Sequence, residues 1–340
     1  MRLRNIEFGS VFNASGARNF FGHDNWWFHK LYRLVGLSYR GCTFVTKTTT
    51  LEERPGFMPL KRGSTQPKEL MPECIKVDFL RSTVLNKVGL SGPGLRWLLS
   101  DGAWQSNIDP FVISVMAIGP DKDHHLIEYR LLADLLAEYA PKFLSAFALQ
   151  INFSCPNVGH SQKEMTEEVF EALAIFGAKL PDTPFILKFN ALLEIEKALA
   201  FGQHERCDAI VMGNTIPFGQ LANRIDWKAL FGTDVSPLKG VGIVMENGKP
   251  VLDDEGKPKR DQGGGGLSGA PLLPIHVDWI KAAREAGFVK PIIACGGILH
   301  PQDVRWLADI GADGIEIGSA SILRPWRVQD IIDEGRRLFT

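Results

Sequence analysis

A cysteine between two asparagines follows an apolar segment in the middle of the chain. Residues 147–153, FALQINF, form an apolar run, and the polar sequence SCPN (154–157) comes directly after it. The thiol of Cys155 can take or give a proton, and the carboxamides of Asn152 and Asn157 can pair with an amide-rich heterocycle. The alternative is that Cys155 is a small buried hydrophobe and that the asparagines form turns. Taken alone, the motif favours this structural alternative. The other motifs of the chain decide between the two interpretations.

Two lysines stand near the ends of other apolar segments. Lys47 ends the segment 42–47, and Lys188 lies inside the segment 185–190. A lysine at such a place is most often a surface residue whose stem lies along apolar neighbours. Beside the N1–C2 carbonyl region of a flavin, however, an ammonium group would stabilise the negative charge that develops on reduction. Two lysines at strand ends favour this second interpretation.

Asparagines also stand just after apolar, strand-like segments or in the loops that follow them. Asn86 lies in a loop after the segment 42–47, and Asn214 precedes Thr215 after another apolar segment. On one face of a fold, these two together with Asn152 and Asn157 would bind a ring that carries ureide and amide groups. The eight histidines are scattered, so the sequence predicts no metal site.

Three glycine-bearing loops predict a phosphate site. They are GGLSG (265–269), CGGI (295–298) and IGSA (317–320), and the last two each precede a helical segment. Loops after the seventh and eighth strands of α/β barrels often bind phosphate through backbone N–H groups, which a Cβ would obstruct. The alternative is that the glycines only form tight turns. Neither a P-loop nor a Rossmann fingerprint occurs, so the phosphate is expected to belong to FMN or a phosphorylated metabolite.

Apolar and helical segments alternate along the chain. Eight short segments have the composition of buried parallel strands, and amphipathic stretches lie between many of them. This alternation predicts a (β/α)8 TIM barrel, with a doubly wound open sheet as the competing fold. The expected strands are 10–14, 42–47, 111–118, 147–153, 185–190, 208–213, 291–295 and 313–318, and the clearest helices are 125–140, 166–180 and 274–287.

Two segments depart from the alternation. Residues 51–110 are rich in proline, glycine and charge, and we expect them to cross the C-terminal (top) face as loops or short strands. Residues 232–266 form an insertion in which two turn sequences flank the short strand 251–254, so a β-hairpin excursion is expected. We expect one barrel domain over residues 1–340.

Composition indicates a cytoplasmic protein without a nucleic-acid partner. The chain has 340 residues, a hydrophobic content of 45% and a formal net charge of −1. Its five cysteines are widely spaced and form no C-x-x-C pair, which argues against a disulfide framework or a metal cluster. Neither a signal segment nor a run of eighteen apolar residues occurs. The aromatic and basic segment 25–40 can lie on a membrane, but an amphipathic helix packed on the sheet is the favoured interpretation.

Together these motifs resemble the dihydroorotate dehydrogenases, FMN-containing (β/α)8 barrels that oxidise dihydroorotate to orotate in pyrimidine synthesis. The matching motifs fall in family order across nearly the whole chain. They are FNASG (12–16), TKT (46–48), LN (85–86), VGL (88–90), NFSCPN (152–157), Lys188, NT (214–215), GLSG (266–269), GGI (296–298) and IGS (317–319).

The resemblance implies a role for individual residues. Cys155 stands where the soluble class 1 enzymes have their catalytic base and the membrane-bound class 2 enzymes have serine. It would take the C5 proton of dihydroorotate while a hydride leaves C6 for flavin N5. Lys188 would lie at the flavin ring and Lys47 near both flavin and substrate. The implied substrate-binding residues are Lys47, Asn86, Asn152, Asn157, Asn214 and Thr215.

The resemblance also implies the cofactor site and the partners. The implied FMN-binding residues are Ala14, Ser15, Gly16, Lys47, Thr48, Asn86, Asn152 and Lys188, with Ser268, Gly269, Gly296, Gly297, Gly318 and Ser319 at the phosphate. A homodimer is expected, and a separate iron–sulfur and FAD subunit is the alternative partner. The insertion 232–266 is longer than soluble class 1 enzymes carry, and the region through Tyr39 is unusual, so the electron acceptor stays open.

Three other functions remain open from the sequence. The pyrimidine-reducing domain of dihydropyrimidine dehydrogenases shares the Ser-Cys-Pro motif and acts on uracil and thymine, but it has histidine where this chain has Asn157. A flavin-free isomerase or aldolase barrel would use Lys188 as a Schiff base and leave the asparagines without a role. A barrel that only stores FMN would leave Cys155 without one.

Overall fold

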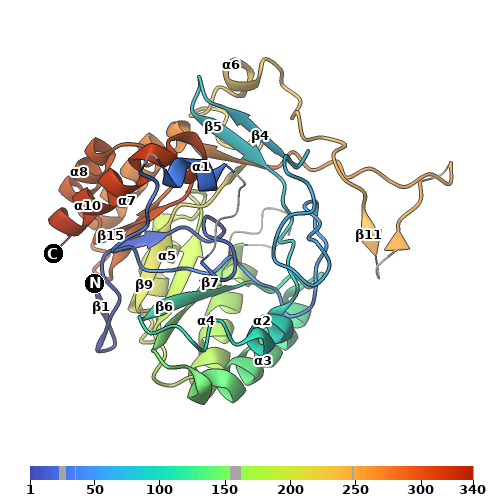
Figure 1. Ribbon diagram of the computed structural model, residues 1–340. Helices are drawn as coiled ribbons and strands as arrows, with labels where there is room; N and C mark the ends of the chain where they lie inside the picture. The colour runs from blue at the N-terminus through green and yellow to red at the C-terminus, as the bar shows by residue number, and fades with distance from the viewer. Residues whose placement is uncertain (23–27, 35, 154–161, 247–248, 254, 340) are drawn as a thin grey trace.

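The protein's computed structural model describes residues 1–22, 28–34, 36–153, 162–246, 249–253 and 255–339. Its centre is a curled sheet of seven parallel strands in the order β3-β15-β14-β9-β8-β7-β6 (Figure 1). The strands are β3 (Val11–Asn13), β6 (Phe111–Val115), β7 (Phe147–Asn152), β8 (Phe185–Phe189), β9 (Ala209–Met212), β14 (Ile292–Cys295) and β15 (Gly314–Ile317).

The segment 43–49 lies between β3 and β6 and closes the sheet. The Thr43 N–H donates to the Val11 carbonyl at 2.8 Å, and the Thr46 N–H donates to the Val112 carbonyl at 2.9 Å. All eight predicted strands therefore take part in one parallel barrel. The predicted (β/α)8 fold is confirmed, and the competing open sheet is wrong.

A bulge explains why the segment 43–49 is not a regular strand. After Thr46, the next backbone bond from this segment to β6 runs from the Thr49 N–H to the Ser114 carbonyl at 2.9 Å, so three residues here match two on β6. The Ser114 N–H donates instead to Thr46 Oγ1 at 3.0 Å. An extra residue interrupts a ladder and re-aims the side chains that follow it. Those side chains include Lys47 and Thr48.

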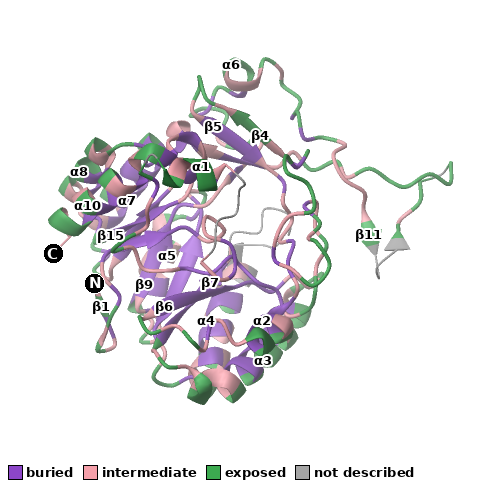
Figure 2. Ribbon diagram, viewed as in Figure 1, coloured by how far each residue is buried: buried purple, intermediate pink, exposed green. Residues whose placement is uncertain are grey.

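Helices pack around the outside of the barrel, with their exposed faces outward (Figure 2). Helix α3, one of the two longest, is capped by the Asp121 side chain, which accepts from the His124 N–H at 3.0 Å. The three helices predicted most clearly are confirmed within a few residues, as α3, α4 and α7. The main helices are α2 (Leu95–Asp101), α3 (Lys122–Tyr139), α4 (Gln162–Lys179), α5 (Ile195–Gln203), α7 (Leu273–Glu285), α8 (Pro301–Asp309) and α10 (Val328–Leu338).

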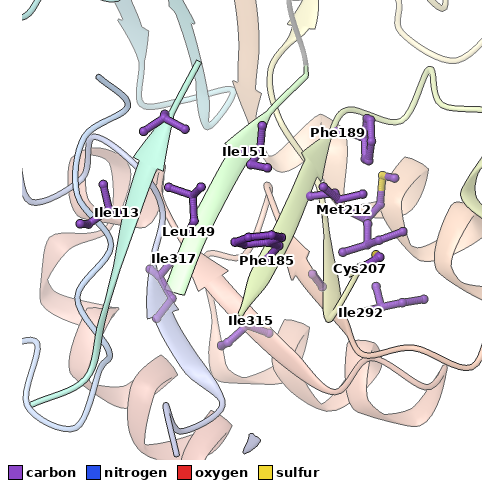
Figure 3. Close-up of a cluster of buried hydrophobic side chains, with 14 of the residues drawn as sticks. Ile113, Leu149, Ile151, Phe185, Phe189, Cys207, Met212, Ile292, Ile315 and Ile317 are labelled. Atoms are coloured by element: carbon purple, nitrogen blue, oxygen red, sulfur yellow. The ribbon is translucent and has the colours of Figure 1, made fainter. Parts of the chain in front are cut away.

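Alternation along each strand builds two apolar layers. Val112, Ala148 and Ile186 belong to the cluster inside the barrel, whereas their neighbours in sequence belong to the cluster between strands and helices. Figure 3 shows part of the outer cluster, including Leu149 and Phe185. Since both faces are covered, the strands read as continuous apolar runs, which is why the sequence revealed them.

A four-stranded antiparallel sheet lies beside the barrel, in the order β10-β13-β5-β4. Its strands are β4 (Ile75–Asp78), β5 (Thr83–Asn86), β10 (Ile216–Pro217) and β13 (Gly266–Gly269). The short strands expected within residues 51–110 are confirmed by β4 and β5. The sequence GLSG, interpreted as a phosphate loop, is strand β13 and pairs with β5 along its length.

The insertion 232–266 contains the expected β-hairpin. Strands β11 (Met245–Glu246) and β12 (Lys249–Pro250) pair antiparallel, and an isolated bridge joins Leu252 to Pro258 further along. The hairpin extends away from the barrel at the right of Figure 1. Of the expected strand 251–254, residue 254 lies outside the described residues, and residues 251–253 contribute the isolated bridge at Leu252 rather than a regular strand.

The aromatic segment 25–40 forms a shorter helix than predicted. Its described part is helical over α1 (His29–Arg33) alone, where His29 is buried and Leu31 is exposed. No helix within the described ranges has the length and apolarity needed to cross a membrane.

Candidate active site

The predicted site residues come from the carboxyl ends of the barrel strands. Asn152 ends β7, Lys188 is the penultimate residue of β8, and Asn214 follows β9. In the register of the sheet Asn152 lies beside Lys188. Because parallel strands end at one edge, their terminal side chains share the face where barrel enzymes carry their chemistry.

Lys188 forms a buried ion pair across the barrel. Its Nζ lies 2.5 Å from Oε2 of Glu316 on β15 and 4.0 Å from Sγ of Cys295 on β14. The side chains of Lys188 and Glu316 are only 4% and 1% exposed. Burial acts to lower the pKa of Lys188, but the neighbouring Cys295 and Glu316 together outweigh it, and the pKa is raised. The ammonium is therefore fixed as a cation.

Lys47 is equally enclosed but has a neutral partner. Its Nζ donates to the Ser91 carbonyl at 2.7 Å and lies 5.0 Å from the centre of the Phe20 ring. Burial lowers the pKa of Lys47 to about 8. This lysine can therefore exchange a proton near neutral pH, as a group near substrate and flavin would need to do.

The asparagines divide into one linked pair and one nearby residue. Asn214 Nδ2 donates to Asn152 Oδ1 at 3.2 Å, and the Thr215 N–H donates to Asn214 Oδ1 at 2.9 Å. Asn86 Nδ2 donates to the Gly266 carbonyl at 3.4 Å on the adjacent sheet. The structure thus brings Asn152, Asn214 and Thr215 together. Cys155 and Asn157 lie outside the described residues.

The loop after β3 contacts the segment that carries Lys47. Ser15 Oγ lies 2.8 Å from Thr48 Oγ1 and accepts from the Thr48 N–H at 2.7 Å. The Ala14 N–H donates to the Ile317 carbonyl at the end of β15 at 2.9 Å. Gly16 has a φ of +92°, which other residues rarely adopt. These predicted flavin contacts therefore lie next to one another.

The two remaining glycine loops have the geometry of a phosphate cradle. Gly296 and Gly297 have φ values of +96° and +82°, and a Cβ on Gly297 would lie 2.6 Å from the backbone nitrogen of Leu273. Ser319 Oγ is buried and has no hydrogen-bond partner among the described residues. A buried hydroxyl without a partner requires an acceptor, and a phosphate oxygen would supply one. Ser268 and Gly269 lie in strand β13.

Three buried residues of the barrel interior were missed by sequence reasoning. Ser114, Gln150 and Glu316 lie on β6, β7 and β15 and are at most 1% exposed. A signal existed, because a carboxylate inside the apolar run DGIEIG (313–318) is unfavourable unless another strand supplies a cation.

His276 on α7 was also missed. It packs against the glycine loop, its Nε2 has no partner within the described part of the chain, and a Cβ on Gly296 would lie 2.6 Å from its Cε1. Burial lowers the pKa of His276 to about 4, so this ring is neutral under ordinary conditions.

Seven parallel strands are closed by the segment 43–49, buried polar residues lie beside an apolar cluster in the interior, and glycine loops stand at the carboxyl ends of the strands. These features define a (β/α)8-barrel enzyme. The family model described as dihydroorotate dehydrogenase matches residues 36–338, and the chain belongs to this family of oxidoreductases. The resemblance found in the sequence motifs, including its class 1 character, is confirmed.

Individual relatives agree with the family assignment. A protein from Staphylococcus carnosus named dihydroorotate dehydrogenase B (NAD(+)), catalytic subunit, is 26% identical over 280 residues, 80% of this chain and 77% of the relative. A protein from Thermotoga maritima with the same name is 27% identical over 283 residues, 81% of this chain and 86% of the relative. A relative from Pediococcus pentosaceus, named for the A (fumarate) type, is 28% identical over 333 residues, 95% of this chain and 88% of the relative.

Proposed function

We propose that this chain binds FMN and oxidises dihydroorotate to orotate in pyrimidine biosynthesis. The observation that carries the proposal is the Lys188 ammonium beside the carboxamides of Asn152 and Asn214, at the ends of three neighbouring strands. A fixed cation suits the negative charge of a reduced flavin, and the paired amides suit a pyrimidine ring. A Schiff-base aldolase fits less well, because Lys188 is held charged in an ion pair rather than neutral.

The described residues fit an FMN phosphate. Gly296 and Gly297 both have a positive φ, and the Ser319 hydroxyl is buried without a hydrogen-bond partner among the described residues. Gly318 approaches Ala14 so closely that a Cβ on the glycine would lie 3.1 Å from the Ala14 Cβ. We assign the phosphate to Gly296, Gly297, Gly318 and Ser319, with Ser268 and Gly269 nearby and Ala14, Ser15, Gly16 and Thr48 along the ring.

The proposed chemistry balances as a two-electron oxidation. Cys155 takes the C5 proton of dihydroorotate, the C5–H electron pair forms the C5=C6 bond, and the hydride leaves C6. When bound, FMN supplies the acceptor for that hydride. Asn86, Asn152, Asn157, Asn214 and Thr215 hold the substrate ring, and Lys47 lies between substrate and cofactor.

Two measurements test the proposal. Flavin released by heat from the purified chain should be FMN, and anaerobic dihydroorotate should bleach it. Dihydrouracil, tested in parallel, should bleach it much more slowly, because it lacks the carboxylate of dihydroorotate. A colourless protein that cannot be reconstituted with FMN, or faster bleaching by dihydrouracil, would overturn the assignment.

We infer that the electrons leave through another protein subunit. Relatives named as catalytic subunits of the B (NAD(+)) type support a separate electron-transfer subunit joined to a homodimer of this chain. Light scattering on the pure chain should give a dimer, and a strict monomer would contradict this part.

A further inference from the structure

Glu316 is the only charged residue on the inner face of β15, and both of its oxygens are engaged. Oε2 pairs with Lys188, and Oε1 accepts from Gln150 Nε2. Gln150 Oε1 accepts in turn from Ser114 Oγ at 3.1 Å, and Ser114 Oγ lies 2.9 Å from Thr48 Oγ1. The carboxylate is therefore fixed from two sides.

The direction of every proton in this chain of hydrogen bonds follows from the carboxylate. An ionised carboxylate only accepts, so the Gln150 amide nitrogen donates to Glu316 and its oxygen must accept from Ser114. The Ser114 hydroxyl has then used its proton, and Thr48 must donate to it. Ser15 must donate to Thr48 by the same reasoning. All donors point toward Glu316, which stabilises its negative charge.

The two buried lysines show what this carboxylate does. Lys47 has a carbonyl partner, and burial lowers its pKa to about 8. Lys188 is at least as buried, yet its pKa is raised. Both Cys295 and Glu316 act to raise it, but Glu316 Oε2 lies 2.5 Å from Lys188 Nζ and Cys295 Sγ lies 4.0 Å away. Burial raises the pKa of the Cys295 thiol to about 12, which keeps it uncharged near neutral pH. Glu316 is therefore the carboxylate in direct contact with Lys188.

Few other titratable groups face this pair. Of the described residues on β7, β8 and β9, only Lys188 is titratable, and β14 contributes Cys295. Cys42 interacts electrostatically with Glu316, but burial raises the pKa of that thiol to about 12. No second carboxylate in this described part of the barrel could replace Glu316.

We propose that Glu316 is a positioning residue that keeps Lys188 charged, and aimed into the barrel, in both redox states of the bound flavin. The inference rests on the proposed function, because it assumes that the ligand beside Lys188 gains negative charge on reduction. It assigns a role to Glu316, Gln150 and Ser114 that the substrate and phosphate contacts do not require.

The test compares Glu316→Gln with the wild-type holoenzyme. The flavin reduction equilibrium is measured against redox dyes from pH 6 to 10, without dihydroorotate. At low pH the variant keeps the ammonium of Lys188 but lacks the negative charge of Glu316, so reduced flavin should be favoured more than in wild type. At high pH its lysine loses the proton, and the difference should reverse. Between these limits the variant-to-wild-type ratio of equilibrium constants should fall about tenfold per pH unit. Lys47 titrates in both proteins, so its contribution cancels in the ratio.

Two further variants separate the outcomes. Adding Lys188→Arg to Glu316→Gln should abolish the pH dependence of the ratio, because a guanidinium stays charged throughout. Glu168→Gln removes another buried carboxylate, on α4, and should leave the flavin equilibrium unchanged. A Glu316→Gln protein with a pH-independent ratio would overturn the inference while leaving the proposed function intact. Absence of bound FMN from the wild-type protein would instead overturn the proposed function.

A single variant keeps the inference testable if Glu316→Gln fails to fold. Lys188→Arg with Glu316 intact should differ from wild type by a ratio that does not change with pH, because both cations are then permanent. A ratio that rises by about tenfold per pH unit above pH 8 would show that the wild-type lysine titrates, and the inference would be wrong.

Discussion

Ser319 carries a buried hydroxyl that has no partner within the described residues, and such a group is unfavourable until something completes it. Its neighbour Ser321 is also buried but donates to the Gly318 carbonyl at 2.6 Å. The two serines therefore differ in what their hydroxyls are expected to do. The Ser321 hydroxyl makes a hydrogen bond within the fold, whereas the Ser319 hydroxyl is available to a ligand.

Replacing Ser319 with alanine should separate cofactor binding from stability. A hydrogen bond to a charged group contributes about 1.5–3 kcal/mol, so FMN should bind about 10–100-fold more weakly. The apo protein should lose no stability. Ser321→Ala should have the opposite effect: the free energy of unfolding should fall by about 1 kcal/mol, and FMN affinity should change little. Fluorescence titration with FMN and urea unfolding measure the two effects, and equal FMN affinities for wild type and Ser319→Ala would contradict the phosphate assignment.

Cys155 is the residue on which the proposed proton transfer depends. Cys155→Ala should keep FMN and fold, and it should slow flavin reduction by dihydroorotate by roughly 10²–10⁴, the share of a positioned general base. Cys155→Ser should recover activity only at higher pH, because a hydroxyl ionises less readily than a thiol. Stopped-flow absorbance of the flavin gives both rates. Near-normal reduction by the alanine variant would mean that another group is the base.

At the scale of elements, Lys87 links the insertion 232–266 to the sheet that carries Asn86. Its Nζ pairs with the Asp261 carboxylate, donates to the Val241 carbonyl at 3.0 Å, and lies 4.9 Å from the centre of the Phe57 ring. A Cβ on Gly265 would lie 2.7 Å from the Asn86 carbonyl oxygen. Movement of the insertion would therefore move Asn86.

Lys87→Met should loosen the insertion without unfolding the barrel. Without the ammonium, the two ends of the insertion lose a shared partner, and protease cleavage within residues 243–260 should accelerate about tenfold. The KM for dihydroorotate should rise while FMN stays bound. Lys257→Met is a matched control, since Lys257 is exposed and pairs with Glu255 inside the same hairpin. Equal cleavage rates for the two variants would show that Lys87 does not hold the insertion.

At the scale of the whole molecule, two buried histidines give opposite pH dependences. Hydrogen bonding to Glu168 raises the pKa of His125, whose Nδ1 lies 2.9 Å from Oε1 of that carboxylate. Burial lowers the pKa of His276 to about 4. The first pair stabilises the fold where histidine is charged, and the second residue stabilises it where histidine is neutral.

The contribution of His125 can be isolated with Glu168→Gln. Because its folded-state pKa is raised, its stabilisation is fully present below the unfolded pKa of about 6.5 and is lost as the pH rises through the folded pKa. Wild type should therefore exceed the variant in free energy of unfolding by the most near pH 5.5, by about 1.5–3 kcal/mol, and by less at pH 9. Denaturant unfolding at both pH values measures this. A difference that grows toward pH 9 would show that the pair is not charge-assisted.

The fold was predictable because its strands are buried on both faces. Segments such as 147–153 and 208–213 are continuously apolar, and that pattern survives in any parallel barrel. The bulge at 46–49 was not predictable, because it depends on a bond between Thr46 Oγ1 and the Ser114 N–H. The sequence GLSG predicts a loop, but its four residues form a strand because they pair with β5.

By itself the sequence determined which residue types stand at the ends of the strands, and through its motifs the family. The tertiary structure alone decided which of those residues meet. Lys188 and Glu316 are 128 positions apart, and the local sequence around either residue does not predict which residue it pairs with. They meet because closing a barrel turns alternate side chains of every strand toward one interior, where an isolated charge is unfavourable and a matched pair is stable.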